Sequence, residues 1–229
     1  MKFYSAWYCP FAQRVWFALL LKAIDFEYIE VDPYHKSDWW LKVSRNSAKV
    51  PVIVTPNKSK QGELTVIEST RIVEYLDELI TEIQPLQPQG PNERAEQRYW
   101  LDHIDKAIIP YFYRFLQAKD GEGYRDQSKQ QMLAGLESIT QAMGQSGPFF
   151  YGNQISMIDI QLAPFAYRID VLLGHYREFI LPRHGGNWVR YQRWYQSILE
   201  EPAFKQTSTA NEDYTRRLIK FYLRYTRSV

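Results

Sequence analysis

Cysteine, whose thiolate is a strong nucleophile, occurs only once among the 229 residues, as Cys9. It follows a short apolar run and precedes Pro10 and a long apolar stretch, which predicts a strand, a short loop and a helix with Pro10 in its first position. The free N–H groups and the positive end of the helix dipole would then face the Cys9 sulfur. In that field a thiol loses its proton more readily than a free cysteine, whose pKa is about 8.5. We therefore expect Cys9 to be a thiolate that does covalent sulfur chemistry.

Cys9 also has a purely structural interpretation. A lone cysteine is often buried and then behaves as a small hydrophobe, so Cys9 followed by Pro10 does not by itself separate reactivity from packing. Two further stretches, around Pro51 and Ser69, favour reactivity.

The first of these stretches is a strand that opens with a proline. Val52 to Val54 reads as a central strand behind Lys49-Val50-Pro51, and proline is tolerated as the first residue of a strand. In a turn, such an X–Pro bond can be cis. A cis bond would leave the N–H and C=O of Val50 free to pair with an extended peptide ligand, whereas a trans proline would only begin the strand.

The second stretch is Glu68-Ser69-Thr70-Arg71, which leads from a strand into an amphipathic helix. Ser69 is a natural N-cap for that helix. A helix start with a hydroxyl and free N–H groups is a ready site for a carboxylate. The alternative is that Ser69 caps the helix and has no further role.

Strands and helices alternate in the part of the chain that carries these residues. The expected order over residues 1–81 is strand, helix, strand, helix, strand, strand, helix. The expected elements are a strand at 2–5, a helix at 10–22, a strand at 26–31, a short helix at 38–42 capped by Ser37, a hairpin of 52–54 and 64–67 joined by a polar turn at 56–62, and a helix after Ser69 that reaches 79. Residues 82–92 contain three prolines and a glycine, which predicts a linker.

Residues 93–229 are expected to be all-helical, so the fold class is α/β followed by all-α. Apolar spacing predicts helices at 94–117, with a kink at Pro110, and at 132–143 and 188–199. Ser156 and Asp159 form a capping box that opens another helix. The basic amphipathic helix that begins near residue 212 could lie on a membrane, but we expect it to dock on its own domain.

Bulk composition excludes several classes of protein. The net charge of +2 argues against a dedicated nucleic-acid binder. A single cysteine cannot form an internal disulfide, the first residues lack a signal-peptide pattern, and no apolar run reaches the roughly 18 residues of a membrane span. We therefore expect a soluble, cytoplasmic protein with no metal and with neither nucleic acid nor membrane as a partner.

Taken together and in this order, three motifs resemble a glutathione transferase over essentially the whole chain. They are Cys9-Pro10-Phe11-Ala12, Val50-Pro51 and Glu68-Ser69, followed by the capping box of the helical half. The cysteine is similar to that of the omega class, whereas other classes carry a tyrosine or serine hydroxyl there. The resemblance implies a thioredoxin-like domain over 1–81, a linker over 82–92, a C-terminal helical bundle domain over 93–229, and a homodimer.

The resemblance also implies a role for each matched residue. Cys9 would form a mixed disulfide with glutathione, which is a co-substrate. The backbone of Val50, held by Pro51, would pair with the cysteinyl part of glutathione. Glu68 would bind the ammonium group of the γ-glutamyl end, and Ser69 would bind its carboxylate.

The remaining residues that the resemblance points to are less firmly aligned. Lys36 or Lys49 would meet the glycyl carboxylate. Both candidates stay open, because residues 44–48 depart from the usual Asn-Pro-x-Gly pattern and the alignment shifts there. Phe11 is assigned to the glutathione site and is also an aromatic candidate for a second-substrate pocket between the domains. The other candidates for that pocket, which would take a small hydrophobic or oxidised substrate, are Tyr111, Tyr113 and Tyr167.

The chemistry follows from the absence of a second cysteine in the first motif. A glutathionylated Cys9 has no internal resolving thiol, so a second glutathione must release it in a ping-pong scheme. We expect a thiol transferase or reductase that removes glutathione from adducts or reduces dehydroascorbate-type substrates. The alternatives are conjugation of glutathione to electrophiles by a hydroxyl of Tyr4, Ser5 or Tyr8, and a non-catalytic ligand-binding or partner protein on the same fold.

Overall fold

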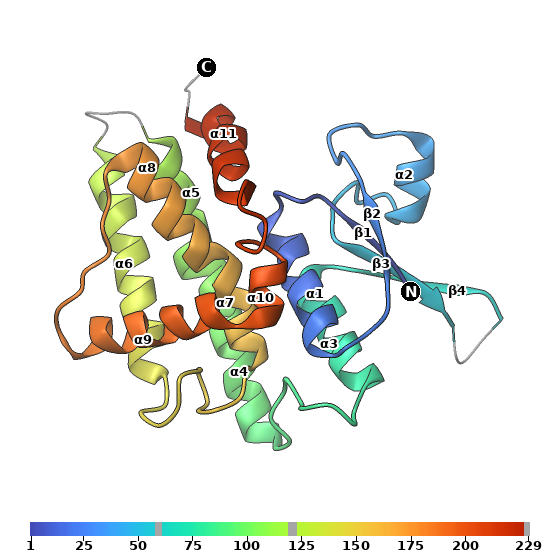
Figure 1. The fold of residues 1–229 in the computed structure, drawn as a ribbon, viewed down its shortest axis with the longest axis horizontal. Helices are drawn as coiled ribbons and strands as arrows, with labels where there is room; N and C mark the ends of the chain where they lie inside the picture. Colours follow the sequence, from blue (N-terminus) through green and yellow to red (C-terminus); the bar gives the residue numbers. More distant parts are fainter. Residues whose placement is uncertain (58–60, 119–122, 227–229) are drawn as a thin grey trace. The chain divides into compact units, whose positions relative to one another are not determined.

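The computed structural model describes residues 1–57, 61–118 and 123–226, and it divides the chain into two compact units (Figure 1). The units are Met1–Pro85 and Leu86–Val229. The division falls inside the segment expected to be a linker. Part of the polar turn expected at 56–62 lies outside the described residues.

The N-terminal unit has the expected βαβαββα order and is thioredoxin-like. Its sheet has the strand order β2-β1-β3-β4, in which β1 is parallel to β2 and antiparallel to β3, and β3 is antiparallel to β4. The elements are β1 (Lys2–Ser5), α1 (Pro10–Leu21), β2 (Glu27–Glu30), α2 (Asp38–Val43), β3 (Val52–Pro56), β4 (Glu63–Ile67) and α3 (Ser69–Leu79).

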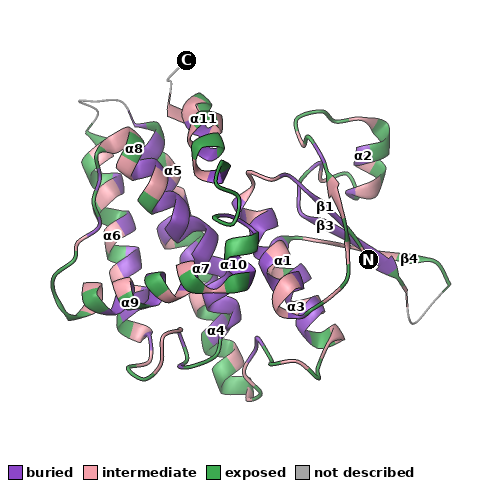
Figure 2. Cartoon of the chain, in the orientation of Figure 1, coloured by how far each residue is buried: buried purple, intermediate pink, exposed green. Residues whose placement is uncertain are grey.

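The core of this unit joins the central strands to α1 and α3. Phe3 on β1 and Ile53 on β3 form a register pair, and both are fully buried. Figure 2 shows buried residues along β3 and on α1 and α3, which pack against each other. This packing fixes the start of both helices relative to the sheet, and Cys9 and Ser69 lie at those two starts.

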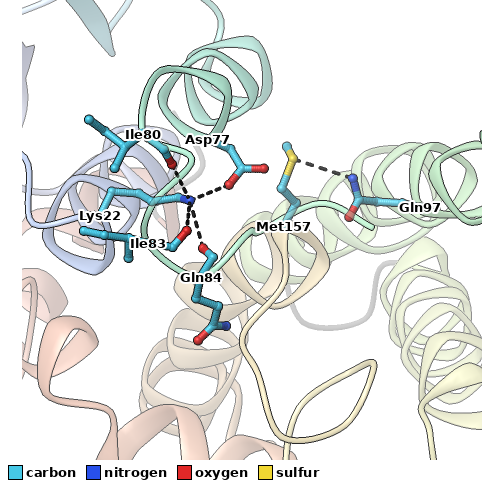
Figure 3. Close-up of polar contacts among 7 residues, drawn as sticks. All are labelled: Lys22, Asp77, Ile80, Ile83, Gln84, Gln97 and Met157. Atoms are coloured by element: carbon cyan, nitrogen blue, oxygen red, sulfur yellow. Dashed lines mark hydrogen bonds and ion pairs between the residues drawn. The ribbon is translucent and has the colours of Figure 1, made fainter. Parts of the chain in front are cut away.

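A buried lysine ties the end of α1 to the end of α3. The ammonium of Lys22 lies 2.6 Å from the Asp77 carboxylate and donates to the carbonyl oxygens of Ile80, Ile83 and Gln84 at 3.1, 3.2 and 2.8 Å (Figure 3). Lys22 is 1% exposed. Buried charges are tolerated when they are paired and hydrogen-bonded, and these contacts fix the chain that leaves α3.

The C-terminal unit is helical, as expected. Its elements are α4 (Pro91–His103), η1 (Ile104–Ile108), α5 (Ile109–Gln117), α6 (Tyr124–Ala142), α7 (Met157–Arg168), η2 (Ile169–Leu173), α8 (Gly174–Arg177), α9 (Gly186–Glu200), α10 (Pro202–Gln206) and α11 (Tyr214–Thr226). None of the helices in the described part of the chain is both long enough and apolar enough to span a bilayer.

Two of the expected helices differ from the observed ones in their bounds or geometry. The helix expected to kink at Pro110 contains the π-helical turn η1 just before this proline. In a regular α-helix the ring of Pro110 would clash with the carbonyl four residues earlier, and the wider turn accommodates it. The helix expected at 132–143 begins earlier, at Tyr124, because its polar first two turns lack the apolar spacing that identifies a helix in a sequence.

The capping box is confirmed and is the centre of a buried polar cluster. The Asp159 carboxylate accepts hydrogen bonds from the N–H and Oγ of Ser156 at 2.8 and 2.7 Å. It also accepts from the Phe150 N–H and from the Trp194 indole N–H at 2.9 and 2.8 Å. Burial raises the pKa of Asp159, and these hydrogen bonds oppose that shift. The box therefore joins α7 to the preceding loop and to α9.

The terminal helix α11 docks on its own unit, as expected. Its buried residues are Tyr214, Leu218 and Tyr222. The guanidinium of Arg168 on α7, which is fully buried, donates to the hydroxyls of Tyr214 and Tyr222 at 3.2 and 3.3 Å. Elsewhere in this unit, the Gln97 amide donates to the Met157 sulfur at 3.7 Å (Figure 3).

Candidate functional site

Cys9 is the N-cap residue of α1, and Pro10 is the first residue of that helix. The Cys9 N–H donates to the Ala6 carbonyl at 2.8 Å, and the Gln13 N–H donates to the Cys9 carbonyl at 3.0 Å. The Cys9 side chain is half-buried, and its sulfur lies 3.9 Å from the carbonyl oxygen of Val50. The sulfur therefore lies at the positive end of the helix and beside the loop that precedes β3.

A pocket of about 150 Å³ in the N-terminal unit contains most of the residues that the motifs selected. Residues from three separate stretches of the sequence meet in it. Its lining consists of Phe11, Ser47, Lys49, Val50, Pro51, Ile67, Glu68 and Ser69. The contact between the Cys9 sulfur and Val50 places the cysteine beside this lining.

The loop before β3 presents its backbone at the pocket. The Val50–Pro51 peptide bond is cis. In the described parts of the chain, the N–H of Val50 donates to no protein acceptor. The neighbouring Lys49 N–H donates to the Ser47 hydroxyl at 3.2 Å. Ser47 was not selected from the sequence, although a serine two residues before the lysine is typical of such a turn.

The start of α3 differs from the expectation by one residue. Ser69 is the first residue of the helix, and Glu68 occupies the N-cap position that we had assigned to Ser69. Glu68 has φ 71° and ψ 117°, an uncommon backbone conformation for a residue other than glycine. Its side chain is exposed, whereas Ser69 is 6% exposed and its hydroxyl accepts a hydrogen bond from Arg14 at 3.3 Å. The Glu68 and Ser69 side chains can therefore offer a carboxylate and a hydroxyl to the same ligand.

The two lysine candidates lie in different surroundings. Lys49 lines the pocket, and Lys36 does not. Lys36 is exposed in the turn before α2, whose N-cap is Ser37. Lys49 therefore offers a cation to an anionic ligand in this pocket.

The three tyrosines proposed for a second substrate lie in the helical unit and do not share one environment. Tyr167 is 4% exposed, and its hydroxyl is 2.5 Å from the Thr215 hydroxyl. Tyr113 is half-buried, with ring contacts to Phe165 and a neighbouring phenylalanine. Tyr111 lines a separate pocket of about 440 Å³ on α5 and α6, and Arg114 lies 5.3 Å from its ring centroid. Tyr167 is thus part of the packing of its unit.

The hydroxyl candidates for the alternative chemistry also differ in accessibility. Tyr4 and Ser5 are buried on β1, at 6% and 1% exposure. Tyr8 is half-buried and directly precedes Cys9. Burial, followed by nearby Tyr34 and Asp32, raises the pKa of Tyr8 well above its usual value. The Tyr8 hydroxyl therefore keeps its proton at neutral pH and can donate a hydrogen bond.

Comparisons with known proteins agree with the fold. Models of the glutathione S-transferase N-terminal and C-terminal domains match residues 8–79 and 122–197. Glutathione S-transferase U16 of Arabidopsis thaliana is 31% identical over 169 residues, which cover 72% of this chain and 70% of that protein. The chain therefore belongs to the glutathione transferase family, and the family implies glutathione transferase activity with glutathione as co-substrate.

Solved structures with this fold come from more than one class. Glutathione transferase Omega 3C from Trametes versicolor has a TM-score of 0.80 and 30% identity, over 98% of this chain and 89% of that one. The Tau class glutathione S-transferase MiGSTU from mango, Mangifera indica, has a TM-score of 0.82 and 25% identity, over 98% of each chain. Similarity of fold alone thus does not distinguish the Omega class from the Tau class. That distinction depends on the chemistry of the site.

Proposed function

We propose that this protein is a glutathione-dependent thiol transferase that acts through a mixed disulfide between Cys9 and glutathione. The observation that carries the proposal is the position of the Cys9 sulfur at the start of α1, 3.9 Å from the carbonyl oxygen of Val50 in the pocket lining. A helix N-terminus stabilises a thiolate, which is the nucleophilic form of cysteine. The neighbouring lining offers a free backbone N–H, a cation and a carboxylate, which are the groups needed to hold a γ-linked tripeptide.

Each pocket residue binds a different part of glutathione in this proposal. The N–H and C=O of Val50 pair with the cysteinyl part of glutathione, next to Pro51. Glu68 binds the ammonium of the γ-glutamyl end, and Ser69 with the first N–H groups of α3 binds its carboxylate. Lys49 binds the glycyl carboxylate. Phe11, which also lines the pocket, covers the apolar part of the ligand.

The reaction is balanced by one molecule of reduced glutathione for each glutathionylated substrate. The Cys9 thiolate attacks the glutathionyl sulfur of a substrate disulfide R–S–SG, and R–S⁻ leaves and takes a proton from solvent. A glutathione thiolate then attacks the glutathionyl sulfur of the Cys9 adduct, which releases oxidised glutathione and restores the Cys9 thiolate. The net reaction converts R–S–SG and reduced glutathione into R–SH and oxidised glutathione. Substrates of the dehydroascorbate type would enter as oxidants of the same thiols.

The cysteine at this position, together with the similarity to an Omega transferase, supports the cysteine-type class. The resemblance further supports a homodimer, which light scattering on the purified protein would test. Tyr111 and Tyr113 remain the candidates for contact with the second substrate, since Tyr167 is buried by Thr215 and its neighbours.

Conjugation of glutathione to electrophiles is the second candidate function. It is favoured by Tyr8, the residue that directly precedes Cys9. The hydroxyl of Tyr8 is protonated and could donate a hydrogen bond to a glutathione thiolate. A Cys9→Ser variant would keep this activity while losing thiol transfer. Conversely, a wild-type protein that conjugates aryl halides but transfers no sulfur would establish conjugation as the function.

Steady-state thiol transfer from a glutathionylated peptide tests the proposal. We expect ping-pong kinetics and a loss of roughly 100-fold or more in kcat/KM for Cys9→Ser. A Cys9→Ser protein with full activity would remove Cys9 from the mechanism. If calorimetry detects no binding of glutathione to the wild type, the chain is instead a non-catalytic ligand-binding or partner protein on this fold.

A further inference from the structure

A buried arginine lies behind the pocket and contacts two of its lining residues. Arg14, on α1, is 1% exposed. Its Nη1 donates to the Ser69 hydroxyl oxygen at 3.3 Å, and its guanidinium carbon lies 4.9 Å from the centre of the Phe11 ring. It thus joins the start of α1 to the start of α3.

The geometry determines how the Ser69 hydroxyl can be used. Arginine has only donors and keeps its charge in proteins. Because the Ser69 oxygen accepts from Arg14, the hydroxyl hydrogen must point along a different direction, and a hydroxyl that accepts from a cation becomes a stronger donor. Ser69 lines the pocket as the first residue of α3. The hydroxyl, the helix N-terminus and the charge of Arg14 all favour an anion at the same place.

We propose that Arg14 is a positioning residue that makes the pocket select a free carboxylate on the γ-glutamyl end of its ligand. Arg14 orients and polarises the Ser69 hydroxyl and adds a permanent positive charge behind it, without touching the ligand itself. The inference rests on the proposed function, because it takes glutathione as the ligand of this pocket. It assigns to Arg14 a role in ligand discrimination that is separate from the sulfur chemistry of Cys9.

Three variants separate this role from a structural one. Arg14→Met keeps most of the side-chain volume and removes the charge, and Arg14→Lys keeps the charge but loses the planar group that donates at fixed angles. Arg168→Met is the matched control, because Arg168 is also fully buried and donates to two hydroxyls, but in the helical unit. Circular dichroism and thermal unfolding establish that each variant is folded.

Calorimetry compares two ligands on each protein: glutathione, and an analogue that lacks the γ-glutamyl carboxylate, 4-aminobutanoyl-cysteinyl-glycine. We expect Arg14→Met to weaken glutathione binding by about 10-fold or more, as for the loss of a charge-assisted hydrogen bond, and to leave binding of the analogue nearly unchanged. Arg14→Lys should recover part of the preference for glutathione. Arg168→Met should keep the wild-type ratio of the two affinities. The rate of Cys9 alkylation by iodoacetamide should be the same in all four proteins.

Coupling to Ser69 completes the test. Ser69→Ala should reduce the preference for glutathione, and adding Arg14→Met to it should cost less than the sum of the two single changes. Equal weakening of both ligands by Arg14→Met and Arg14→Lys, or additive effects with Ser69→Ala, would overturn the inference. Failure of the proposed function is visible separately, as a wild-type protein that transfers no sulfur or binds no glutathione. If Arg14→Met does not fold, the Arg14→Lys and Ser69→Ala ligand ratios decide the question.

Discussion

Glu68 holds the most constrained backbone position in the candidate site. Its φ of 71° lies in a region that L-residues seldom occupy, and such conformations cost about 1–3 kcal/mol and occur often at ligand sites. The conformation brings the chain from β4 into α3, so that Glu68 and Ser69 both line the pocket. The site thus depends on a backbone arrangement that the fold holds against its local preference.

Replacing Glu68 by glycine separates the contribution of this residue to stability from its contribution to binding. Glycine adopts positive φ readily, so the free energy of unfolding of Glu68→Gly should stay constant or rise by up to about 2 kcal/mol. Glutathione affinity should fall, because the carboxylate that we propose binds the ammonium is lost. Urea unfolding and calorimetry measure the two quantities. Glu68→Gln, which keeps the strained backbone and loses the charge, is the control, and a loss of stability in the glycine variant alone would contradict this account.

Local sequence motifs predicted most of the residues that line the pocket. Phe11, Lys49, Val50, Pro51 and Glu68 line it as expected, because each lies next to the start of a predicted helix or strand. The role of each of these residues in binding glutathione remains a proposal.

Other residues of the site were not selected from local patterns. Ser47 and Ile67 line the pocket through the packing of the loop before β3 and of β4, and Arg14 on α1 contacts the lining residue Ser69 from behind. The choice of Lys49 over Lys36 depends on the course of the loop between α2 and β3. Such contacts are set by tertiary structure, and among these residues only Ser47 has a local signal, as a turn serine two residues before Lys49.

Helix α1 is anchored at both ends, and each end has a different function. Its first turn carries Cys9 and Pro10, and the residue after its last turn is Lys22. The Lys22 ammonium is held by Asp77 and by three carbonyl groups at the end of α3 (Figure 3). Because α1 and α3 begin at the site and are joined at their opposite ends, the buried ion pair contributes to the positions of both helix starts.

Removing the charge of Lys22 should destabilise the N-terminal unit. Lys22→Met leaves the Asp77 carboxylate buried without its cation, and breaking a buried pair in this way costs about 3–5 kcal/mol. Guanidinium unfolding followed by circular dichroism measures the change. The double variant Lys22→Met with Asp77→Leu should recover much of the loss, because it removes both buried charges. A single variant within about 1 kcal/mol of the wild type would show that the pair has no such role.

Elements were predictable where a residue pattern has a local cause. Pro10 began α1, Ser37 capped α2, and Ser156 with Asp159 opened α7, as expected. The early start of α6 at Tyr124 and the π-helical turn before Pro110 were missed. Packing of neighbouring helices stabilises a polar helical turn and a widened one, and neither leaves a periodic apolar pattern in the sequence.

Across the whole molecule, tyrosine is used both on the surface and in the core. Tyr191 is fully buried on α9, and burial followed by the charge of Asp170 holds its pKa well above the usual value. Tyr195 is likewise raised by burial, and its hydroxyl donates to Asp170 at 3.0 Å. These hydroxyls are protonated in the folded state at a pH at which they would ionise in the unfolded chain.

Alkaline unfolding of the helical unit follows from these tyrosines. A pKa raised by folding stabilises the protein fully below the unfolded-state value of about 10, and this contribution is lost as the pH rises from there toward the folded-state pKa. We expect tyrosinate absorbance from buried residues to appear together with the loss of helical circular dichroism. Full ionisation of the tyrosines near pH 10 in a protein that keeps its helices would contradict this expectation.

Cys9 is, in this proposal, the nucleophile beside a pocket that binds glutathione. The most direct measurement is the intact mass of the protein after incubation with oxidised glutathione, followed by peptide mapping. We expect a gain of one glutathionyl group that is located on Cys9, is reversed by reduced glutathione and is absent in Cys9→Ser. A protein that stays unmodified under these conditions, although it binds reduced glutathione in a calorimeter, would contradict the claim.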